Sequence, residues 1–196
     1  MRKWRVEKRE TLFSHRLFDL RRESLIAESG EPTRREALTL AAPGWVNVIA
    51  LLPDEKVLLV RQWRFGIGAE TIEIPGGMVE PEELPAAAAA RELFEETGYR
   101  AGRISWLGEV QPNPAFITNR CQTFIAHDLV QDGEPQGDGE EELVVEIRPL
   151  AEIPQLIVNG AIRHALVVAA FYLFEHASPQ PAHRAEFVSH PREATP

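Results

Sequence analysis

The chain has 196 residues, of which 44% are hydrophobic and 26% charged, which is typical of one globular domain with an appendage. Its formal net charge of −9 argues against nucleic acid as the principal partner, because phosphate backbones require basic patches. The one cysteine, Cys121, excludes an internal disulfide framework and a four-cysteine zinc site.

The sequence predicts neither a secretory signal nor a membrane span. The first residues are charged and lead into no apolar core segment, and the best apolar run, 165–174, is about half of the ~20 residues that span a bilayer. We therefore expect a cytoplasmic protein with no membrane partner.

Composition divides the chain into three parts. Residues 1–42 alternate charged and apolar residues, which predicts two or three antiparallel strands with too few apolar residues to fold alone. Residues 43–177 form the main domain, and residues 178–196, rich in Pro, His, Ala and charges, are expected to be a disordered tail.

The main domain mixes strands and helices. Apolar runs predict a hairpin of strands over 45–52 and 56–60, and further strands over 71–75, 104–110, 121–126 and 143–147. Residues 153–158 favour a short helix, and residues 161–175 are apolar on nearly every side, which predicts a largely buried helix. Pattern alone therefore indicates a mixed α and β domain.

The most informative stretch is 75–99, which reads PGGMVEPEELPAAAAARELFEETGY. A tight turn leads to Pro85, which suits the first turn of a helix, and five alanines follow before Gly98 in the position of a left-handed cap. Glu92, Glu95 and Glu96 share one face of this helix, and no lysine on that face offsets their repulsion. A solvated acidic face is one interpretation, and a bound divalent cation is the other, because Mg²⁺ and Mn²⁺ prefer carboxylate oxygens.

The spacing of the whole stretch favours the second interpretation. Gly77, Glu83, Arg91-Glu92-Leu93, Glu95-Glu96 and Gly98 match the fixed positions of the Nudix hydrolase signature, and only Tyr99, in place of an aliphatic residue, departs from it. The chain thus resembles the Nudix family, which implies an α/β/α sandwich around a mixed β-sheet, here with antiparallel N-terminal strands added. The resemblance implies Mg²⁺, or Mn²⁺, held by Glu92, Glu95, Glu96 and the carbonyl of Gly76, with Arg91 and Glu83 orienting these glutamates.

The same resemblance points to the branch that hydrolyses ADP-ribose. Gln62 and Arg64 form a Q-x-R segment ahead of the signature, where the arginine would hold the pyrophosphate. Pro114, sixteen residues after Gly98, matches a proline of that branch, although Ala115 replaces the glycine that often follows it. A glutamate of the 140–142 run would be the catalytic base, with Glu141 our first choice and Glu140 our second.

The expected reaction is therefore Mg²⁺-dependent hydrolysis of a nucleoside diphosphate sugar, with ADP-ribose the leading substrate. GDP-mannose, another such sugar or a dinucleoside polyphosphate are alternative substrates, and a non-catalytic regulator that binds a nucleotide is an alternative function. In this branch the N-terminal strands pair with a second subunit, so we expect a homodimer whose N-terminal segments complete the substrate pocket.

Overall fold

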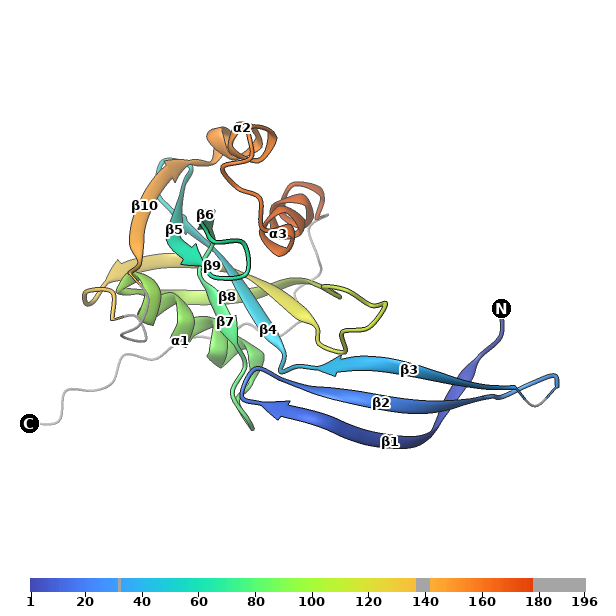
Figure 1. The fold of residues 1–196 in the computed structure, drawn as a ribbon. Helices are drawn as coiled ribbons and strands as arrows, with labels where there is room; N and C mark the ends of the chain where they lie inside the picture. Colours follow the sequence, from blue (N-terminus) through green and yellow to red (C-terminus); the bar gives the residue numbers. More distant parts are fainter. Residues whose placement is uncertain (32, 137–141, 178–196) are drawn as a thin grey trace, which may run out of the picture. The chain divides into compact units, whose positions relative to one another are not determined.

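The computed structural model describes residues 1–31, 33–136 and 142–177, and it divides into two compact units (Figure 1). The first unit contains residues 1–44 and 111–120, and the second contains residues 45–110 and 121 onward. The expected tail, 178–196, and both candidate base residues, Glu140 and Glu141, lie outside the described residues.

The first unit is an antiparallel sheet in the order β1 (Trp4–His15), β2 (Phe18–Ala27) and β3 (Arg34–Ala41). The predicted antiparallel strands are therefore present. Segment 111–120 joins this sheet, because Leu40 donates a 2.7 Å hydrogen bond to the Phe116 carbonyl and accepts a 3.0 Å bond from Thr118. β1 is exposed along nearly its whole length, so this sheet contributes little to a hydrophobic core.

The second unit is a mixed sheet of seven strands whose main path runs β10-β5-β4-β9-β8, with β6 beside β5 and β7 beside β4. The strands are β4 (Trp45–Leu52), β5 (Lys56–Arg64), β6 (Ala69–Glu73), β7 (Gly76–Met78), β8 (Tyr99–Val110), β9 (Cys121–Gln131) and β10 (Val144–Pro149). β4 and β9 run parallel, whereas the other named pairs are antiparallel. Every strand predicted in the main domain overlaps an observed one.

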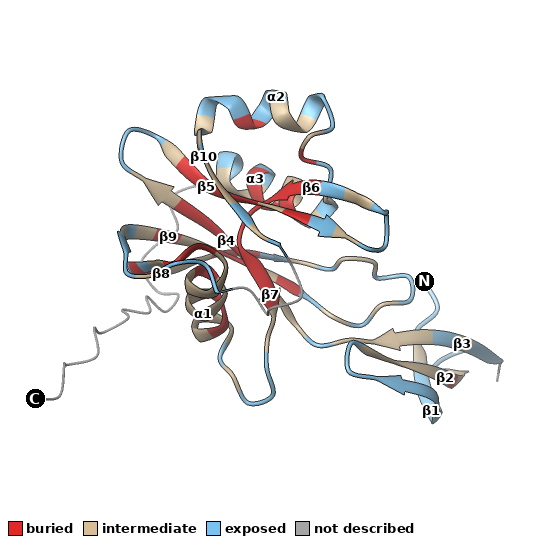
Figure 2. Ribbon diagram, turned by 60° about the vertical axis from the view of Figure 1, so that its left-hand side comes forward, coloured by how far each residue is buried: buried red, intermediate tan, exposed pale blue. Residues whose placement is uncertain are grey.

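Helices cover both faces of this sheet (Figure 1). α1 (Pro85–Thr97) packs Ala88, Ala89 and Leu93 against one face, where Val46 and Val48 of β4 point. On the other face, Ile49 of the same strand meets residues of the short helix α2 (Ile153–Val158) and of α3 (Ala165–His176). Alternate residues of β4 thus pack into two cores, and β4 is buried along much of its length (Figure 2). This confirms the α/β/α sandwich.

Two helical predictions have different outcomes. α1 begins at Pro85 and ends at Gly98, whose φ of 74° is left-handed and whose N–H donates to the Phe94 carbonyl at 2.8 Å, as the sequence predicted. The second apolar helix was expected over 161–175 and largely buried. It begins instead at Ala165 and buries one face, through Val167, Ala170 and Phe171, while Tyr172 is 63% exposed.

The described helices include none that is both long enough and apolar enough to cross a membrane.

Candidate active site

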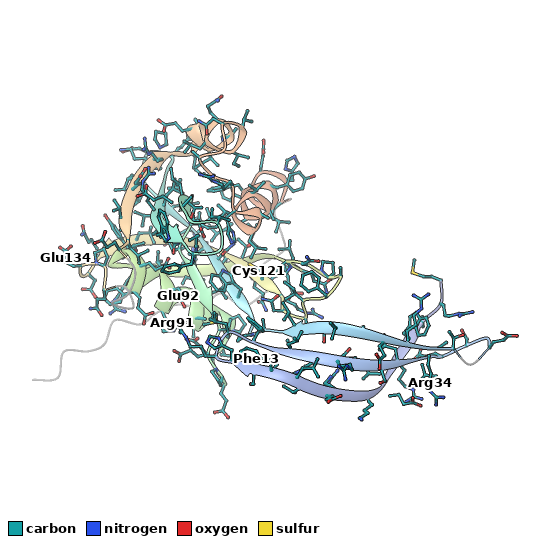
Figure 3. All side chains as sticks on the ribbon, in the orientation of Figure 1. Phe13, Arg34, Arg91, Glu92, Cys121 and Glu134 are labelled. Atoms are coloured by element: carbon teal, nitrogen blue, oxygen red, sulfur yellow. The ribbon has the colours of Figure 1, made fainter. Side chains whose placement is uncertain are left out.

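Arg91, on α1, is the centre of a part-buried polar cluster that includes its neighbour Glu92 (Figure 3). Its guanidinium makes a bidentate pair with Glu83 at 3.0 Å for both bonds, and its Nη2 also donates to the Met78 carbonyl at 3.0 Å. Its Nη1 donates to Glu92 at 2.8 Å and to Glu95 at 3.0 Å. One cation therefore fixes three carboxylates, and the repulsion along the helix, for which the sequence showed no neighbouring lysine, is offset by Arg91.

The charges of this cluster shift one another's ionisation. The hydrogen bond from Arg91 is the main cause that lowers the pKa of Glu83, and the hydrogen bond to Glu83 is the main cause that raises the pKa of Arg91. Burial raises the pKa of Glu92, although Arg91 opposes the shift. Glu83 and Arg91 are thus a fixed ion pair, while Glu92 carries a charge that its surroundings do not fully stabilise.

Glu96 lies apart from Arg91 and points at the turn that precedes the helix. Its Oε2 accepts a 3.0 Å hydrogen bond from the N–H of Gly76. Burial raises its pKa to about 8, and the hydrogen bond from Gly76 only partly opposes this shift. An ionised Glu96 therefore needs a further positive partner.

The turn at Gly76 and Gly77 allows backbone and carboxylates to approach closely. β7 pairs with β4 at this point, with Gly77 opposite Val46 and Gly76 opposite Asn47. A Cβ atom added at Gly77 would lie 2.2 Å from Oε1 of Glu92, and one at Gly76 would lie 2.3 Å from the Val46 carbonyl oxygen. Only glycine fits at either position without displacing these groups.

The predicted metal ligands are therefore adjacent, but they are held by protein partners. Among the residues that the structure describes, no group of three or more His, Cys, Asp or Glu side chains is arranged as a metal site. The chemistry of the donors nevertheless fits a hard divalent cation, because Glu92 and Glu96 are carboxylates whose burial disfavours ionisation in the absence of a cation. Glu92, Glu95 and Glu96 would hold such an ion.

The predicted substrate residues lie in two different places. Gln62 and Arg64 are on the same face of β5, where Gln62 is buried and Arg64 is half-buried. Pro114 belongs to the exposed segment 111–120 of the first unit. The structure thus places Gln62 and Arg64 in the unit that carries the glutamate cluster, and Pro114 in the other.

A buried carboxylate that the sequence did not single out engages Arg64. Glu73, 3% exposed, accepts hydrogen bonds from Nε and Nη2 of Arg64, both at 2.8 Å, and a 2.6 Å bond from the Thr71 hydroxyl. The pairing of β5 with β6 brings these residues to one face. The only sequence signal was the acidic residue inside the apolar strand that leads into the Pro75-Gly76-Gly77 turn.

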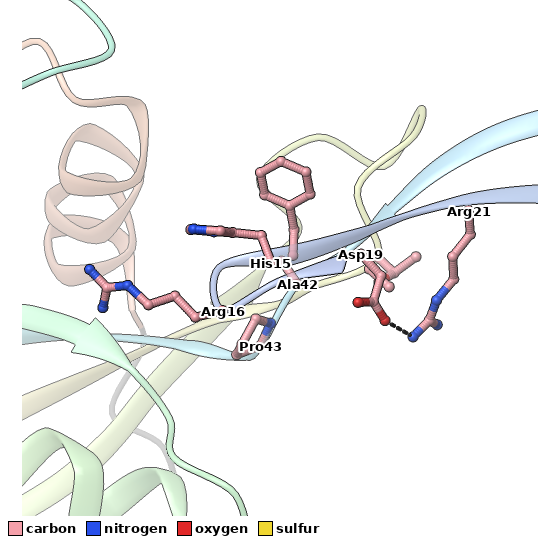
Figure 4. A pocket seen from close by; sticks show the side chains of 9 residues that line it. His15, Arg16, Asp19, Arg21, Ala42 and Pro43 are labelled. Carbon is pink, nitrogen blue, oxygen red and sulfur yellow. Dashed lines mark hydrogen bonds and ion pairs between the residues drawn. The ribbon is translucent and has the colours of Figure 1, made fainter. Parts of the chain in front are cut away.

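The first unit has a cavity of its own, of about 410 Å³ (Figure 4). His15, Arg16, Asp19 and Arg21 are among its lining residues, and the carboxylate of Asp19 accepts a 2.7 Å bond from Arg21. The rings of His15 and Phe18 lie 6.4 Å apart. Charged side chains line this cavity, and the pairing of Asp19 with Arg21 partly neutralises them.

Comparison with known proteins agrees with this geometry. Residues 44–171 match the NUDIX domain model. A methanol dehydrogenase activator from Bacillus methanolicus is 33% identical over 70% of this chain and 73% of its own length. An ADP-ribose pyrophosphatase from Bacillus subtilis (strain 168) is 32% identical over 69% of this chain and 72% of its own.

A solved structure, the crystal structure of an ADP compounds hydrolase, superimposes with a TM-score of 0.77 and 26% identity, covering 88% of this chain and 92% of that one. The domain match, the relatives and this structure agree with one another and with the glycine and glutamate spacing of the turn and α1. The chain belongs to the Nudix hydrolase family.

Proposed function

We propose that this chain hydrolyses the pyrophosphate bond of a nucleoside diphosphate sugar, with ADP-ribose the leading substrate. The observation that carries the proposal is the carboxylate cluster of Glu92, Glu95 and Glu96, assembled around Arg91 and the Gly76-Gly77 turn. The names of two relatives, ADP-ribose pyrophosphatase and ADP-sugar pyrophosphatase, favour this substrate class. Water adds to one phosphorus, the P–O bond of the bridge breaks, and AMP and ribose 5-phosphate leave.

The reaction requires compensation of the negative charge of the diphosphate, and the proposed cofactor is Mg²⁺, with Mn²⁺ as a substitute. When bound to the glutamate cluster, the ion supplies charge neutralisation and makes water more acidic. Arg91 and Glu83 keep Glu92 and Glu95 in place, and the N–H of Gly76 orients Glu96. These contacts preorganise the carboxylates before any ligand arrives.

Arg64 is the proposed phosphate-binding residue of the same unit. A guanidinium presents several donors in one plane, a geometry that matches phosphate oxygens, and Glu73 binds that of Arg64 along one edge. Glu73 then acts by orienting Arg64, and Gln62 lies beside it on the same face of β5. The proton acceptor is Glu141, or Glu140 as the second choice; this assignment rests on the family resemblance alone.

The decisive experiment is a substrate panel with the purified chain and Mg²⁺. ADP-ribose, GDP-mannose and a dinucleoside polyphosphate are incubated with the protein and with a phosphomonoesterase, which releases phosphate only from the products. Phosphate release from ADP-ribose, at a kcat/KM above that of the other two, supports the proposal. Release from GDP-mannose alone would show that GDP-mannose is the preferred substrate. A GDP-mannose pyrophosphatase is also among the relatives.

A regulatory role is the second candidate, because one relative is named as an activator of a dehydrogenase. This chain keeps the glutamates of the signature and the arginine that positions them, which favours catalysis over binding alone. Tight binding of ADP-ribose without any turnover in Mg²⁺ would favour the regulatory role.

We also propose that the chain acts as a homodimer through its N-terminal strands. β1 is exposed along nearly its whole length, and Val6, Leu12 and Phe13 are 37%, 39% and 53% exposed, respectively. An exposed edge strand that carries apolar residues favours a second chain as cover. Sedimentation at micromolar concentration is expected to give a dimer, and a sharp monomer boundary would contradict it.

A further inference from the structure

Asn47 is a buried polar residue inside an otherwise apolar strand. β4 reads WVNVIALL, and Asn47 is 3% exposed. Asparagine is disfavoured in strands, and an amide removed from water lowers stability unless its oxygen and its nitrogen both find partners. Hydrophobic packing therefore does not explain this residue, and its hydrogen bonds have to indicate its role.

Two partners fix the two polar atoms of this amide. Nε1 of Trp45 donates a 3.1 Å hydrogen bond to Oδ1 of Asn47, and Nδ2 of Asn47 donates a 3.3 Å bond to the carbonyl of Leu166 in the first turn of α3. An indole N–H can only donate and a carbonyl can only accept, so these partners determine which way the amide points. Asn47 thus ties the central strand β4 to the beginning of α3.

The same amide lies against Gly76 of the turn that precedes α1. Asn47 is opposite Gly76 where β4 pairs with β7, and a Cβ atom added at Gly76 would lie 2.8 Å from Oδ1 of Asn47. On the backbone, the N–H of Val48 donates a 2.8 Å bond to the carbonyl of Pro75. The turn is therefore held by the backbone of β4 and contacted by the side chain of Asn47.

Gly76 transmits this contact to the glutamate cluster. Its N–H donates the 3.0 Å bond to Oε2 of Glu96, so a displacement of Gly76 changes the position of that carboxylate. Loss of a group that orients a metal ligand typically costs roughly 10–100-fold in metal affinity or activity. A continuous series of contacts thus runs from Leu166 through Asn47 and Gly76 to Glu96.

We propose that Asn47 is a positioning residue of the active site. Its amide holds Gly76 between β4 and α3, and the N–H of Gly76 in turn keeps Glu96 in place for the divalent cation. That Glu96 holds a cation rests on the function proposed above, whereas the contacts of Asn47 do not depend on it. Asn47 acts through Gly76 and takes no part in bond breaking.

Asn47→Leu tests the proposal, because leucine is similar in size and has neither polar atom. In the metal-free chain, amide hydrogen exchange measured by NMR should show that the Gly76 N–H exchanges faster. Its rate should rise about tenfold more than the rates of the slowest amides of the sheet, which report global unfolding. The affinity for Mn²⁺ without substrate, measured by electron paramagnetic resonance, should fall about tenfold.

The kinetic effect should be confined to the metal. The Mg²⁺ concentration that gives half of the maximal rate should rise about tenfold, and KM for ADP-ribose at saturating Mg²⁺ should stay within about twofold of the wild-type value. Asn47→Ser is the second variant, for the case that Asn47→Leu does not fold. Its hydroxyl is too short to replace both bonds of the amide, so the same changes are expected.

Val167→Ala is the matched control. Val167 follows Leu166 on α3, is 1% exposed and belongs to the core between α3 and the sheet. Its truncation leaves a cavity and should lower the melting temperature at least as much as Asn47→Leu does. Exchange of the Gly76 N–H relative to the slowest amides, and the affinity for Mn²⁺, should stay within about twofold of the wild-type values.

Two results would overturn the inference. One is Gly76 exchange and Mn²⁺ affinity in the Asn47 variants that equal those of Val167→Ala, because Asn47 would then only stabilise the fold. The other is a wild-type chain that binds no Mn²⁺. Failure of the proposed function has a different signature, since the chain would then bind Mn²⁺ with an affinity that depends on Asn47 and hydrolyse no member of the substrate panel.

Discussion

Arg64 and Glu73 form a bidentate ion pair across the β5–β6 hairpin, with Nε to Oε1 and Nη2 to Oε2 both at 2.8 Å. The side chain of Glu73 is 4% exposed and that of Arg64 26%, so the pair is largely shielded from water. The Thr71 hydroxyl donates a third bond to the same carboxylate. The geometry of the guanidinium is therefore set by a residue that itself lies too deep to meet a substrate.

Glu73→Gln is expected to destabilise the fold and to weaken substrate binding. The amide keeps one acceptor and loses the charge, which leaves Arg64 with a poorer partner and lowers the free energy of unfolding by about 2 kcal/mol. KM for the diphosphate substrate should rise more than kcat falls, because Arg64 would bind phosphate from a less fixed position. Urea denaturation and steady-state kinetics measure the two effects.

Glu70→Gln is the matched control, because Glu70 lies on the same strand as Glu73. The Glu70 carboxylate is 63% exposed and lies 3.8 Å from its partner, Arg61. Exposed pairs of this kind contribute little. A loss of stability in Glu70→Gln as large as in Glu73→Gln would contradict the role assigned to the buried pair.

The stability difference between Glu73→Gln and the wild-type chain should depend on pH. Burial acts to raise the pKa of Glu73, but the hydrogen bonds and charge of Arg64 outweigh it and the pKa is lowered from 4.5. A carboxyl group with a depressed folded-state pKa contributes stability that is present above its unfolded-state pKa and lost as pH falls through the folded one. Unfolding curves should therefore show the full difference at pH 7 and a smaller one below the folded-state pKa, where Glu73 is protonated.

The ion pair also shows what the sequence could not predict. The helix α1 was predictable to its ends because its signals are local: Pro85 at the first turn, alanines in the middle and Gly98 with a left-handed φ. The partner of Arg64 depends on strand register instead, which pairs Gln62 with Thr71 and Val60 with Glu73. No spacing rule within one strand fixes that register.

The second apolar helix was misjudged for a related reason. Its residues are apolar on most sides, which indicates burial on most sides. In the described residues, however, α3 packs one face into the core of the sheet, and Tyr172 on another side is 63% exposed. Only Val167, Ala170 and Phe171 of α3 are buried in the described structure. The hydrophobicity of a helix shows which residues could be buried, but it does not show how many of its faces the rest of the chain covers.

Arg91→Gln is expected to reduce kcat by roughly 10²-fold, because small displacements of catalytic groups have effects of that size. The variant breaks the bonds to Glu83, Glu92 and Glu95 together, and the carboxylates then repel one another. The loss should be larger at low Mg²⁺, since the cation has to overcome the disorder of its ligands. Titration of activity with Mg²⁺ measures both changes.

Arg100→Gln provides the comparison for that variant. Arg100 pairs with Asp132 at 2.6 Å, but the two side chains are 53% and 57% exposed, so a small change in stability and normal activity are expected. Equal kinetic effects of the two substitutions would show that loss of any arginine near α1 is enough to lower kcat. That result would contradict the specific role of Arg91.

Glu96→Gln is expected to abolish turnover and leave the fold intact. The amide oxygen can still accept the hydrogen bond from Gly76, which holds the side chain in place. Burial raises the pKa of Glu96 to about 8. Its ionised form therefore opposes folding as pH rises above the unfolded-state pKa. In the absence of metal, the neutral amide of the variant should keep or raise the melting temperature. Loss of the carboxylate should weaken Mn²⁺ binding, followed through the paramagnetic signal of the free ion, and lower kcat by several orders of magnitude. Turnover close to that of the wild-type chain, with unchanged Mn²⁺ affinity, would show that the ion is bound elsewhere.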